Sequence, residues 1–358
     1  MNKKIALVTV ALTAALTGCG GGGGGSSSNT APSNGNNTTP TTPVPPVVDP
    51  NALQTTVPNP SYQASSLSLD AYNTLNDART QYGVGLLAES AALNTSSTNH
   101  AKYVTGQFDA GDYFAAGHSE DPTKAGFTGV TPADRASFAK YAGSSVGEAL
   151  ASFIQVDGVQ SAPGKVAIEN LLSAPYHRFG LLSAGRDVGV GVSSTRIQGE
   201  GGLHHIFVAT TGIPQGAQGQ QPSANWIGVW PVDNASNVFY GFAGETPNPI
   251  PVNNGACAGY PVSMQVKSGN TLATTTFTLT EAVSGTAVSS QLNTAATDPN
   301  PSYARQNTAY IIPFKPLKLN TKYTARFVGT NNGVAFEKVW SFTTMAQNAK
   351  LVYGCDPS

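Results

Sequence analysis

The sequence predicts a mixed α+β protein in which a layered α+β domain is followed by an all-β sandwich. Apolar residues recur at helical spacing in the stretches 69–82 and 88–105. Strand patterns follow at 188–192 and 203–210. From residue 222 onward, short alternating runs are separated by turn signals, with few helix signals. Helices that flank late strands in the first part predict layers of helix and sheet.

Residues 1–18 are expected to form a secretory signal peptide. A short positive start precedes an apolar run from Ile5 to Leu16, which is too short to be a transmembrane helix. The ending Leu16-Thr17-Gly18-Cys19 resembles the lipobox of bacterial lipoproteins. The resemblance implies cleavage before Cys19 and a membrane anchor through lipid on that cysteine. Ordinary secretion, with an incidental cysteine, is the alternative.

The residue after Cys19 bears on where the anchored protein is located. It is Gly20, whereas an aspartate there would be the inner-membrane retention signal of Gram-negative lipoproteins. The resemblance therefore implies a secreted, membrane-anchored protein at the outer membrane or cell surface. Residues 19–65 are rich in Gly, Ser, Thr and Pro, so we expect a disordered tether that holds the folded part away from the membrane.

The chain has three cysteines, and lipidation of Cys19 leaves Cys257 and Cys355 as a pair. A secreted location permits a disulfide between them, while two buried free thiols are the alternative. No Cys-X-X-Cys motif is present, which argues against thiol redox chemistry. The formal net charge is −1 and the basic residues are dispersed, so we expect no nucleic-acid partner.

The first domain is expected over residues 66–213. Ser68 or Asp70 can cap its first helix, and His100 falls on the inward face of the second. A core histidine in a hydrogen bond is favoured over a ligand at that position. Further helices are expected from Pro132 to Lys140 and from Lys165 to Leu172.

A histidine and two acids are concentrated in the loop Gly117-His118-Ser119-Glu120-Asp121-Pro122. Only 11% of the residues are charged, so such a cluster stands out. Two later motifs, Gly147-Glu148 and Tyr176-His177-Arg178, carry similar chemistry. We predict that His118, Glu148 and His177 converge on one polar cavity.

Five motifs together resemble the bacterial CAP domain, the SCP-like superfamily of cysteine-rich secretory, antigen 5 and pathogenesis-related proteins. They are Leu75-Asn76-Asp77-Ala78-Arg79, His118, Gly147-Glu148, Tyr176-His177-Arg178-Phe179-Gly180-Leu181-Leu182 and Val188-Gly189-Val190-Gly191-Val192. The resemblance implies a three-layer α-β-α sandwich with a central cleft, in which His118, Glu148 and His177 form a ligand- or metal-binding site. Glu120 and His205 (or His204) are weaker candidates. The family's Gly-Glu-Asn is Gly147-Glu148-Ala149 here, and the tryptophan often found before the His-Arg motif is replaced around Asn170-Leu171.

Two imidazoles and a carboxylate suit a divalent metal, with zinc favoured, and an open position for water. Such an ion could support hydrolysis. The chain lacks His-Glu-X-X-His and Gly-X-Ser-X-Gly motifs, so catalysis has no specific support. The third interpretation is a hydrogen-bonded network that holds the cleft loops together. Arg135 is expected to be solvated or to hold a loop, and Arg178 to pair with an acid or cap a helix.

Residues 214–221 look like a linker, and residues 222–358 are predicted to form an immunoglobulin-like β-sandwich with a C-terminal tail. The stretch from Leu317 to Thr344 is similar to the end of bacterial Ig-like surface domains of the SbsA type. The sequence thus predicts a surface lipoprotein whose first domain binds an ion or an extracellular small-molecule, lipid or protein ligand. The second domain is expected to be a spacer or adhesion module. A metal-assisted hydrolase acting on an envelope or extracellular substrate is the alternative.

Overall fold

The computed structural model describes residues 49–113, 115–157, 162–197, 199, 201–253 and 257–346. The predicted signal peptide, the lipidated Cys19 and most of the tether lie outside the described residues. Cys257 is partly buried against an apolar core, but Cys355 also lies outside them. The lipid anchor and the disulfide therefore stay predictions.

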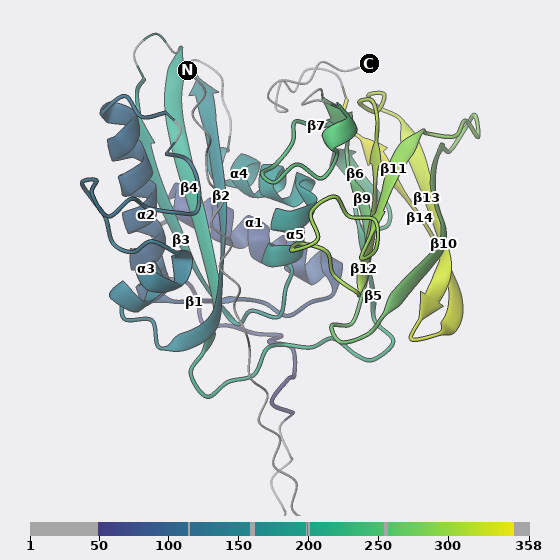
Figure 1. Cartoon of the computed structure of the whole chain (residues 1–358), viewed down its shortest axis with the longest axis horizontal. Helices are drawn as coiled ribbons and strands as arrows, with labels where there is room; N and C mark the ends of the chain where they lie inside the picture. Colours follow the sequence, from purple (N-terminus) through teal and green to yellow (C-terminus); the bar gives the residue numbers. More distant parts are fainter. Residues whose placement is uncertain are drawn as a thin grey trace, which may run out of the picture. The chain divides into compact units, whose positions relative to one another are not determined.

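The described chain is a mixed α+β structure, as the sequence predicts (Figure 1). Its N-terminal region, residues 66–213, contains a four-stranded sheet in the order β1-β3-β4-β2. These strands are β1 (Ala88–Glu89), β2 (Gly143–Val156), β3 (Asp187–Thr195) and β4 (Gly202–Pro214). β1 pairs with β3 in parallel, and the other pairs are antiparallel. β2 is therefore an edge strand.

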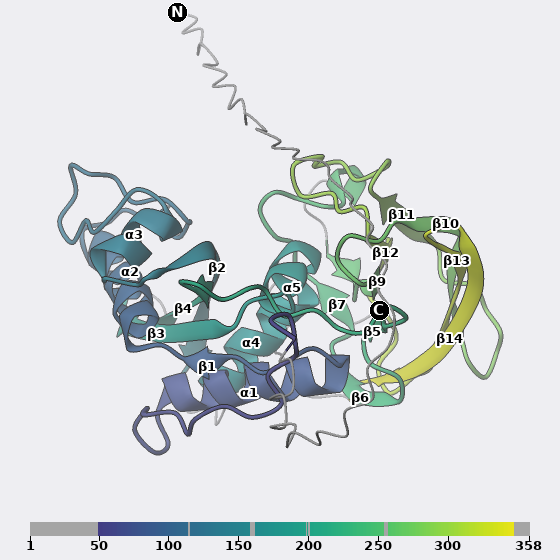
Figure 2. The ribbon, with the colours of Figure 1, turned by 90° about the horizontal axis from the view of Figure 1, so that it is seen from below.

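Helices cover both faces of this sheet (Figure 2). They are α1 (Leu67–Tyr82), α2 (Ala91–Asp109), α3 (Pro132–Phe138), α4 (Pro163–Ser173) and α5 (Pro175–Leu181). α1 and α4 share one apolar core with the sheet, and α2 packs on the opposite face. Two β3 glycines allow α2 to come close, because a Cβ at Gly189 would lie 2.0 Å from backbone of Leu93 and one at Gly191 would lie 2.2 Å from backbone of Ser97.

Local capping explains where the predicted helices begin. Ser66 caps α1, two residues before the expected Ser68, and Thr131 forms a full capping box with Asp134 at α3. α2 begins only after Ser90, because Ala88 and Glu89 are paired with β3. The long strand β2 and the short helix α5 were not predicted.

The C-terminal region, residues 222–346, consists mainly of two four-stranded sheets, ordered β10-β13-β14-β6 and β11-β12-β9-β5. Side chains from both sheets form one apolar core, which includes Met264, Phe327 and Trp340. The strands are β5 (Ile227–Trp230), β6 (Ala235–Val238), β7 (Gly241–Phe242), β8 (Ala258–Gly259), β9 (Val262–Val266), β10 (Leu272–Glu281), β11 (Ser290–Thr294), β12 (Thr308–Pro313), β13 (Lys322–Asn331) and β14 (Val334–Thr344).

The last part of the predicted tether, from residue 49 onward, is hydrogen-bonded to the N-terminal region. Gln54 donates hydrogen bonds to the carbonyls of Leu86 and Arg186, and Arg186 donates in turn to the carbonyls of Pro50 and Ala52. The expectation that residues 19–65 are entirely disordered is therefore wrong from residue 49 onward. Backbone groups there find hydrogen-bond partners on the N-terminal region, which composition alone does not indicate.

The predicted linker is also docked. Gln220 is buried, accepts a hydrogen bond from the Gln54 amide and donates to the carbonyls of Leu86 and Gly185. Contacts between the two regions continue nearby, since the Trp226 ring packs edge-on against Tyr82. Both regions belong to one compact unit within the described residues, and Gln220 anchors the end of the segment 214–221 on the N-terminal region.

Candidate functional site

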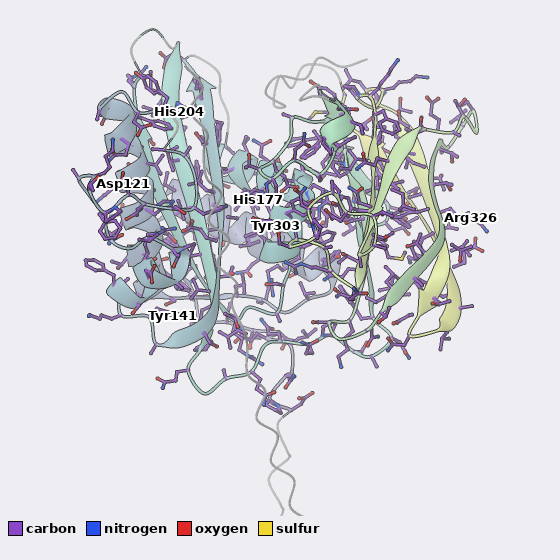
Figure 3. The ribbon with its side chains drawn as sticks, in the orientation of Figure 1. Asp121, Tyr141, His177, His204, Tyr303 and Arg326 are labelled. Atoms are coloured by element: carbon purple, nitrogen blue, oxygen red, sulfur yellow. The ribbon has the colours of Figure 1, made fainter. Side chains whose placement is uncertain are left out.

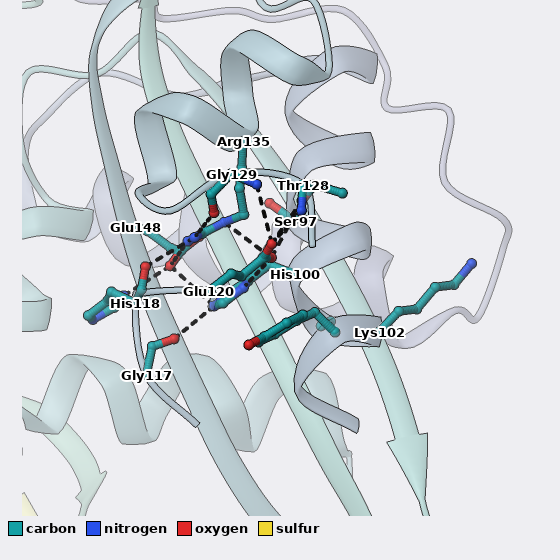
Figure 4. Close-up of polar contacts among 12 residues, drawn as sticks. Ser97, His100, Lys102, Gly117, His118, Glu120, Thr128, Gly129, Arg135 and Glu148 are labelled. Atoms are coloured by element: carbon teal, nitrogen blue, oxygen red, sulfur yellow. Dashed lines mark hydrogen bonds and ion pairs between the residues drawn. The ribbon is translucent and has the colours of Figure 1, made fainter. Parts of the chain in front are cut away.

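Four charged side chains are buried together between α2, α3 and β2 (Figure 4). Arg135 donates two hydrogen bonds of 2.8 Å to the carboxylate of Glu148. His100 lies 2.9 Å from Glu120, and Arg135 lies 3.8 Å from the same carboxylate. We call His100, Glu120, Arg135 and Glu148 the buried charge cluster.

Both ring nitrogens of His100 face acceptors. Nδ1 faces Glu120 Oε1, and Nε2 lies 2.8 Å from the carbonyl oxygen of Gly117. A carbonyl oxygen and an ionised carboxylate can only accept, so both contacts are satisfied when the ring carries two protons. The buried charge cluster then holds two positive and two negative groups, which is the balance that buried charges require.

The neighbours of the two carboxylates hold their pKa values below the ordinary value of 4.5. Burial alone would raise the pKa of Glu148, but the His118 hydrogen bond and the charges of His100 and Arg135 outweigh it. For Glu120, burial is outweighed first by the His100 hydrogen bond and then by the Thr128 amide. Both side chains are therefore carboxylates at neutral pH.

These lowered pKa values predict a loss of stability in acid. The contribution of ionised Glu120 and Glu148 is fully present above the unfolded value of 4.5 and is lost as the pH falls through the lower folded values. The melting temperature should therefore fall more steeply below pH 4.5 in the wild type than in Glu120→Gln, which has one such carboxylate fewer. Equal slopes in the two proteins would contradict this assignment.

His118 connects the buried charge cluster to the surface. Its Nδ1 lies 3.0 Å from Glu148 Oε1, and 42% of its side chain is exposed, against 1% for Glu148. Because the carboxylate accepts, Nδ1 carries the proton, and the neutral ring then has an unprotonated Nε2. In Figure 4 the far edge of the ring points away from Glu148.

His177 is held in the same way, but by a carboxylate of the C-terminal region. Its Nδ1 lies 2.8 Å from Glu245 Oε2. Glu245 also accepts hydrogen bonds from the backbone amides of Tyr176 and His177, in the first turn of α5. Ala174, at the N-cap of α5, offers no side-chain acceptor, so Glu245 replaces the missing cap from a distant part of the sequence.

The two histidine rings face each other, with centroids 6.0 Å apart. Within the described part of the chain, neither Nε2 atom is hydrogen-bonded. Both rings line a small cavity of about 90 Å³ and an adjoining groove of about 740 Å³. Figure 3 shows His177 beside Tyr303, which lines both spaces from the C-terminal region. The groove thus lies between the two regions of the chain.

The structure brings His118, Glu148 and His177 together, as the sequence analysis expects. Glu120 joins them only through the buried charge cluster. His205 is not part of this group, since it is hydrogen-bonded to Ser194 and Gln155 further along the sheet. His204 bonds Ser152 in that part of the sheet too, well away from His177 (Figure 3).

Two further residues, Arg135 and Glu245, hold central positions in the site. Of the two roles expected of Arg135, the structure shows the second: the side chain is fully buried and holds the loop by donating to the carbonyls of His118 and Gly129. Arg135 directly follows the capping box of a short helix in a loop-rich stretch, and this position is a sequence signal for a side chain that holds the neighbouring loop. Glu245 was missed altogether. Arg178 caps α4 through the carbonyls of Leu172 and Ser173, one of the two roles expected of it.

Among the described residues, no group of three or more His, Cys, Asp and Glu side chains is arranged to hold a metal ion. A scan against protein-family models finds no match for this chain, and a search of curated proteins finds none either. None of the helices in the described ranges combines the length and apolar character that crossing a bilayer requires.

Proposed function

We propose that this chain is a surface-anchored lipoprotein whose N-terminal region is a CAP-type domain, and that it binds an extracellular ligand or divalent ion in the groove beside His118 and His177. One observation carries the proposal. Each histidine has Nδ1 bonded to a carboxylate that is 1% exposed, and each leaves Nε2 without a partner in the described residues, beside the groove. Two imidazoles are thereby oriented to present their Nε2 lone pairs to a bound group.

The carboxylates act on the histidines in this arrangement and do not themselves contact the ligand. A histidine that binds a metal usually donates its other N–H to a carboxylate or carbonyl, which fixes the tautomer and the ring orientation. Glu148 and Glu245 take this position for His118 and His177. Glu148 is thereby reassigned from a direct ligand to a positioning residue.

The distance between the rings fits one shared ion. With Zn–N distances of about 2.0–2.1 Å, a ring centroid lies about 3.2 Å from the ion, so two rings that share it are at most about 6.4 Å apart. The observed 6.0 Å is within that limit. Two histidines leave coordination positions that water or the ligand would fill, so we expect moderate affinity rather than a closed structural site.

We put binding before the hydrolase alternative because neither carboxylate next to the two histidines is available as a general base. The two carboxylates nearest the histidines are bonded through both oxygens and are 1% exposed. A general base needs to reach the proton that it removes. The C-terminal region, similar to Ig-like surface domains, then does more than act as a spacer or adhesion module, since it supplies Glu245 and Tyr303.

Zinc titration of the purified full-length chain tests this function. The wild type should bind zinc with a stoichiometry near one, and His118→Ala/His177→Ala should bind it at least tenfold more weakly, because both donors are removed. His204→Ala/His205→Ala is the matched control, with two histidines removed elsewhere on the sheet. Equal zinc binding by the wild type and the His118/His177 variant would exclude the ion site.

A further inference from the structure

The outer edge of β2 carries main-chain groups that β4 does not use. Residues of β2 and β4 pair without a shift from Gly147↔Thr211 to Val156↔Gly202. One step further on, the Asp157 amide donates to the Gly201 carbonyl. Hydrogen-bonded pairs alternate along an antiparallel ladder, so the odd-numbered residues of this stretch bond β4. The amides and carbonyls of the even-numbered residues point away from the sheet.

Side-chain burial alternates along the strand with the same period of two and distinguishes the two faces of the sheet, so only exposed main chain can mark the outer edge. The odd-numbered residues Ala149, Ala151 and Phe153 are buried, whereas the even-numbered Leu150 and Ser152 are not. Glu148 is informative, because its side chain is 1% exposed while the residue as a whole is partly exposed. The accessible area of Glu148 is therefore on its main chain, at the outer edge of the strand.

This edge forms one wall of the groove. Four consecutive residues of β2 line it: Leu150, Ala151, Ser152 and Phe153. Consecutive side chains of a strand point to opposite faces, so a run of four indicates that the groove runs along the edge and not over a face. The C-terminal region forms the opposite wall with residues 243–247, and His118 and His177 also line the groove.

We propose that the ligand of this groove is a polypeptide segment in extended conformation, which pairs its main chain with the outer edge of β2. The proposal rests on the proposed function for the location of the site and names its ligand class. An extended main chain is the ligand that offers donors and acceptors at the strand repeat of about 3.3–3.4 Å. The groove, at about 740 Å³, has the size of a ligand site and not of a large protein interface.

The walls also restrict what the peptide can carry. Among the residues that the structure describes, those lining the groove include two histidines and Glu245 but no lysine or arginine. Glu245 is bonded to α5 and is 1% exposed, so it presents almost no charge to the groove. The main chain therefore supplies most of the binding, and a side chain that can ligate or accept from imidazole is expected next to His118 and His177.

Binding of capped random-sequence octapeptides tests the proposal on the full-length chain. Peptides retained by the immobilised wild type are identified, and the best retained is resynthesised with one N-methylated amide at a time. Methylation at alternate positions should weaken binding by about three- to tenfold, because each of those amides loses one hydrogen bond to β2. Methylation at the intervening positions should have little effect.

Ser152→Pro removes one outward-facing amide of β2 and leaves the odd-numbered ladder intact, which an edge strand tolerates. It should reduce peptide retention at least fivefold. Ser152→Ala also lacks the hydroxyl but keeps the amide, so it should retain peptides at least fivefold better than Ser152→Pro does. If Ser152→Pro does not fold, the N-methylation scan on the wild type decides by itself whether peptide binding has a period of two.

No peptide retained by the wild type above a blank matrix, or retention without the period of two, would overturn the proposal. That result is separable from a failure of the ion site. Zinc binding without peptide retention contradicts only the peptide, and periodic peptide binding without zinc binding contradicts only the ion.

Discussion

Replacing Glu148 with alanine is expected to lower the free energy of unfolding by about 3–5 kcal/mol, the usual cost of removing one partner of a buried ion pair. Arg135 is fully buried and donates both its best hydrogen bonds to this carboxylate. His100 Nε2 lies 3.7 Å from it and loses a second negative neighbour. Glu120 cannot compensate fully, because it is already bonded to His100 and Thr128. Chemical denaturation monitored by circular dichroism gives the value.

The chain contains a matched control for this variant. Arg326 and Glu337 also form a pair with two hydrogen bonds, of 2.8 and 3.1 Å, but both side chains are about half exposed. Glu337→Ala should cost no more than about 1 kcal/mol, because water screens the pair and solvates the arginine that remains. Similar losses for Glu148→Ala and Glu337→Ala would contradict the buried charge cluster.

Replacing Glu245 with alanine is expected to weaken zinc binding by about 10–100-fold, as removal of a carboxylate behind a histidine ligand typically does. The variant removes three contacts at once: the Nδ1 partner of His177 and the acceptor for two amides of α5. Without Glu245, the tautomer of His177 is no longer fixed, and the first turn of α5 has no cap. Zinc titration of the folded variant measures the effect.

Glu281→Ala is the control for this variant in the same region of the chain. Glu281 pairs with Lys318 on the surface, away from the groove. Its removal should leave zinc affinity unchanged. If Glu245→Ala also bound zinc like the wild type, the C-terminal region would be no part of the site and would serve only as the predicted spacer or adhesion module.

The fold is predictable where the signals are local. The helices α1 and α3 carry their own caps, Ser66 and Thr131, and the alternating glycines of β3 mark a close approach to α2. β2 has a weaker signal, because its first nine residues, Gly-Ser-Ser-Val-Gly-Glu-Ala-Leu-Ala, mix glycine, alanine and polar residues. β4 holds it, with partners that lie from 46 positions (Val156↔Gly202) to 71 positions (Gly143↔Pro214) further along the chain, so its pairing is not a local property.

In the candidate site, too, the residues marked by local motifs are predictable and those held by distant partners are not. The positions of His118, Glu148 and His177 follow from motifs that resemble a known family, and the structure places them together. Glu245 lies in a Gly-Glu-Thr-Pro turn of the other region, and no local pattern links it to a histidine 68 positions earlier. The loop-holding role of Arg135 is among those expected from the sequence, but its full burial is not, because a charged side chain normally lies at the surface and here two carboxylates balance it.

The central claim is that the Nε2 atoms of His118 and His177 are the points at which the protein holds a bound group. Anomalous diffraction at the zinc edge, from crystals of the full-length chain soaked in zinc, tests it most directly. We predict one peak about 2.0–2.1 Å from both Nε2 atoms, with the Glu148 and Glu245 carboxylates still on the Nδ1 sides. A peak bound directly by either of these carboxylates, or no peak between the two rings, would contradict the account.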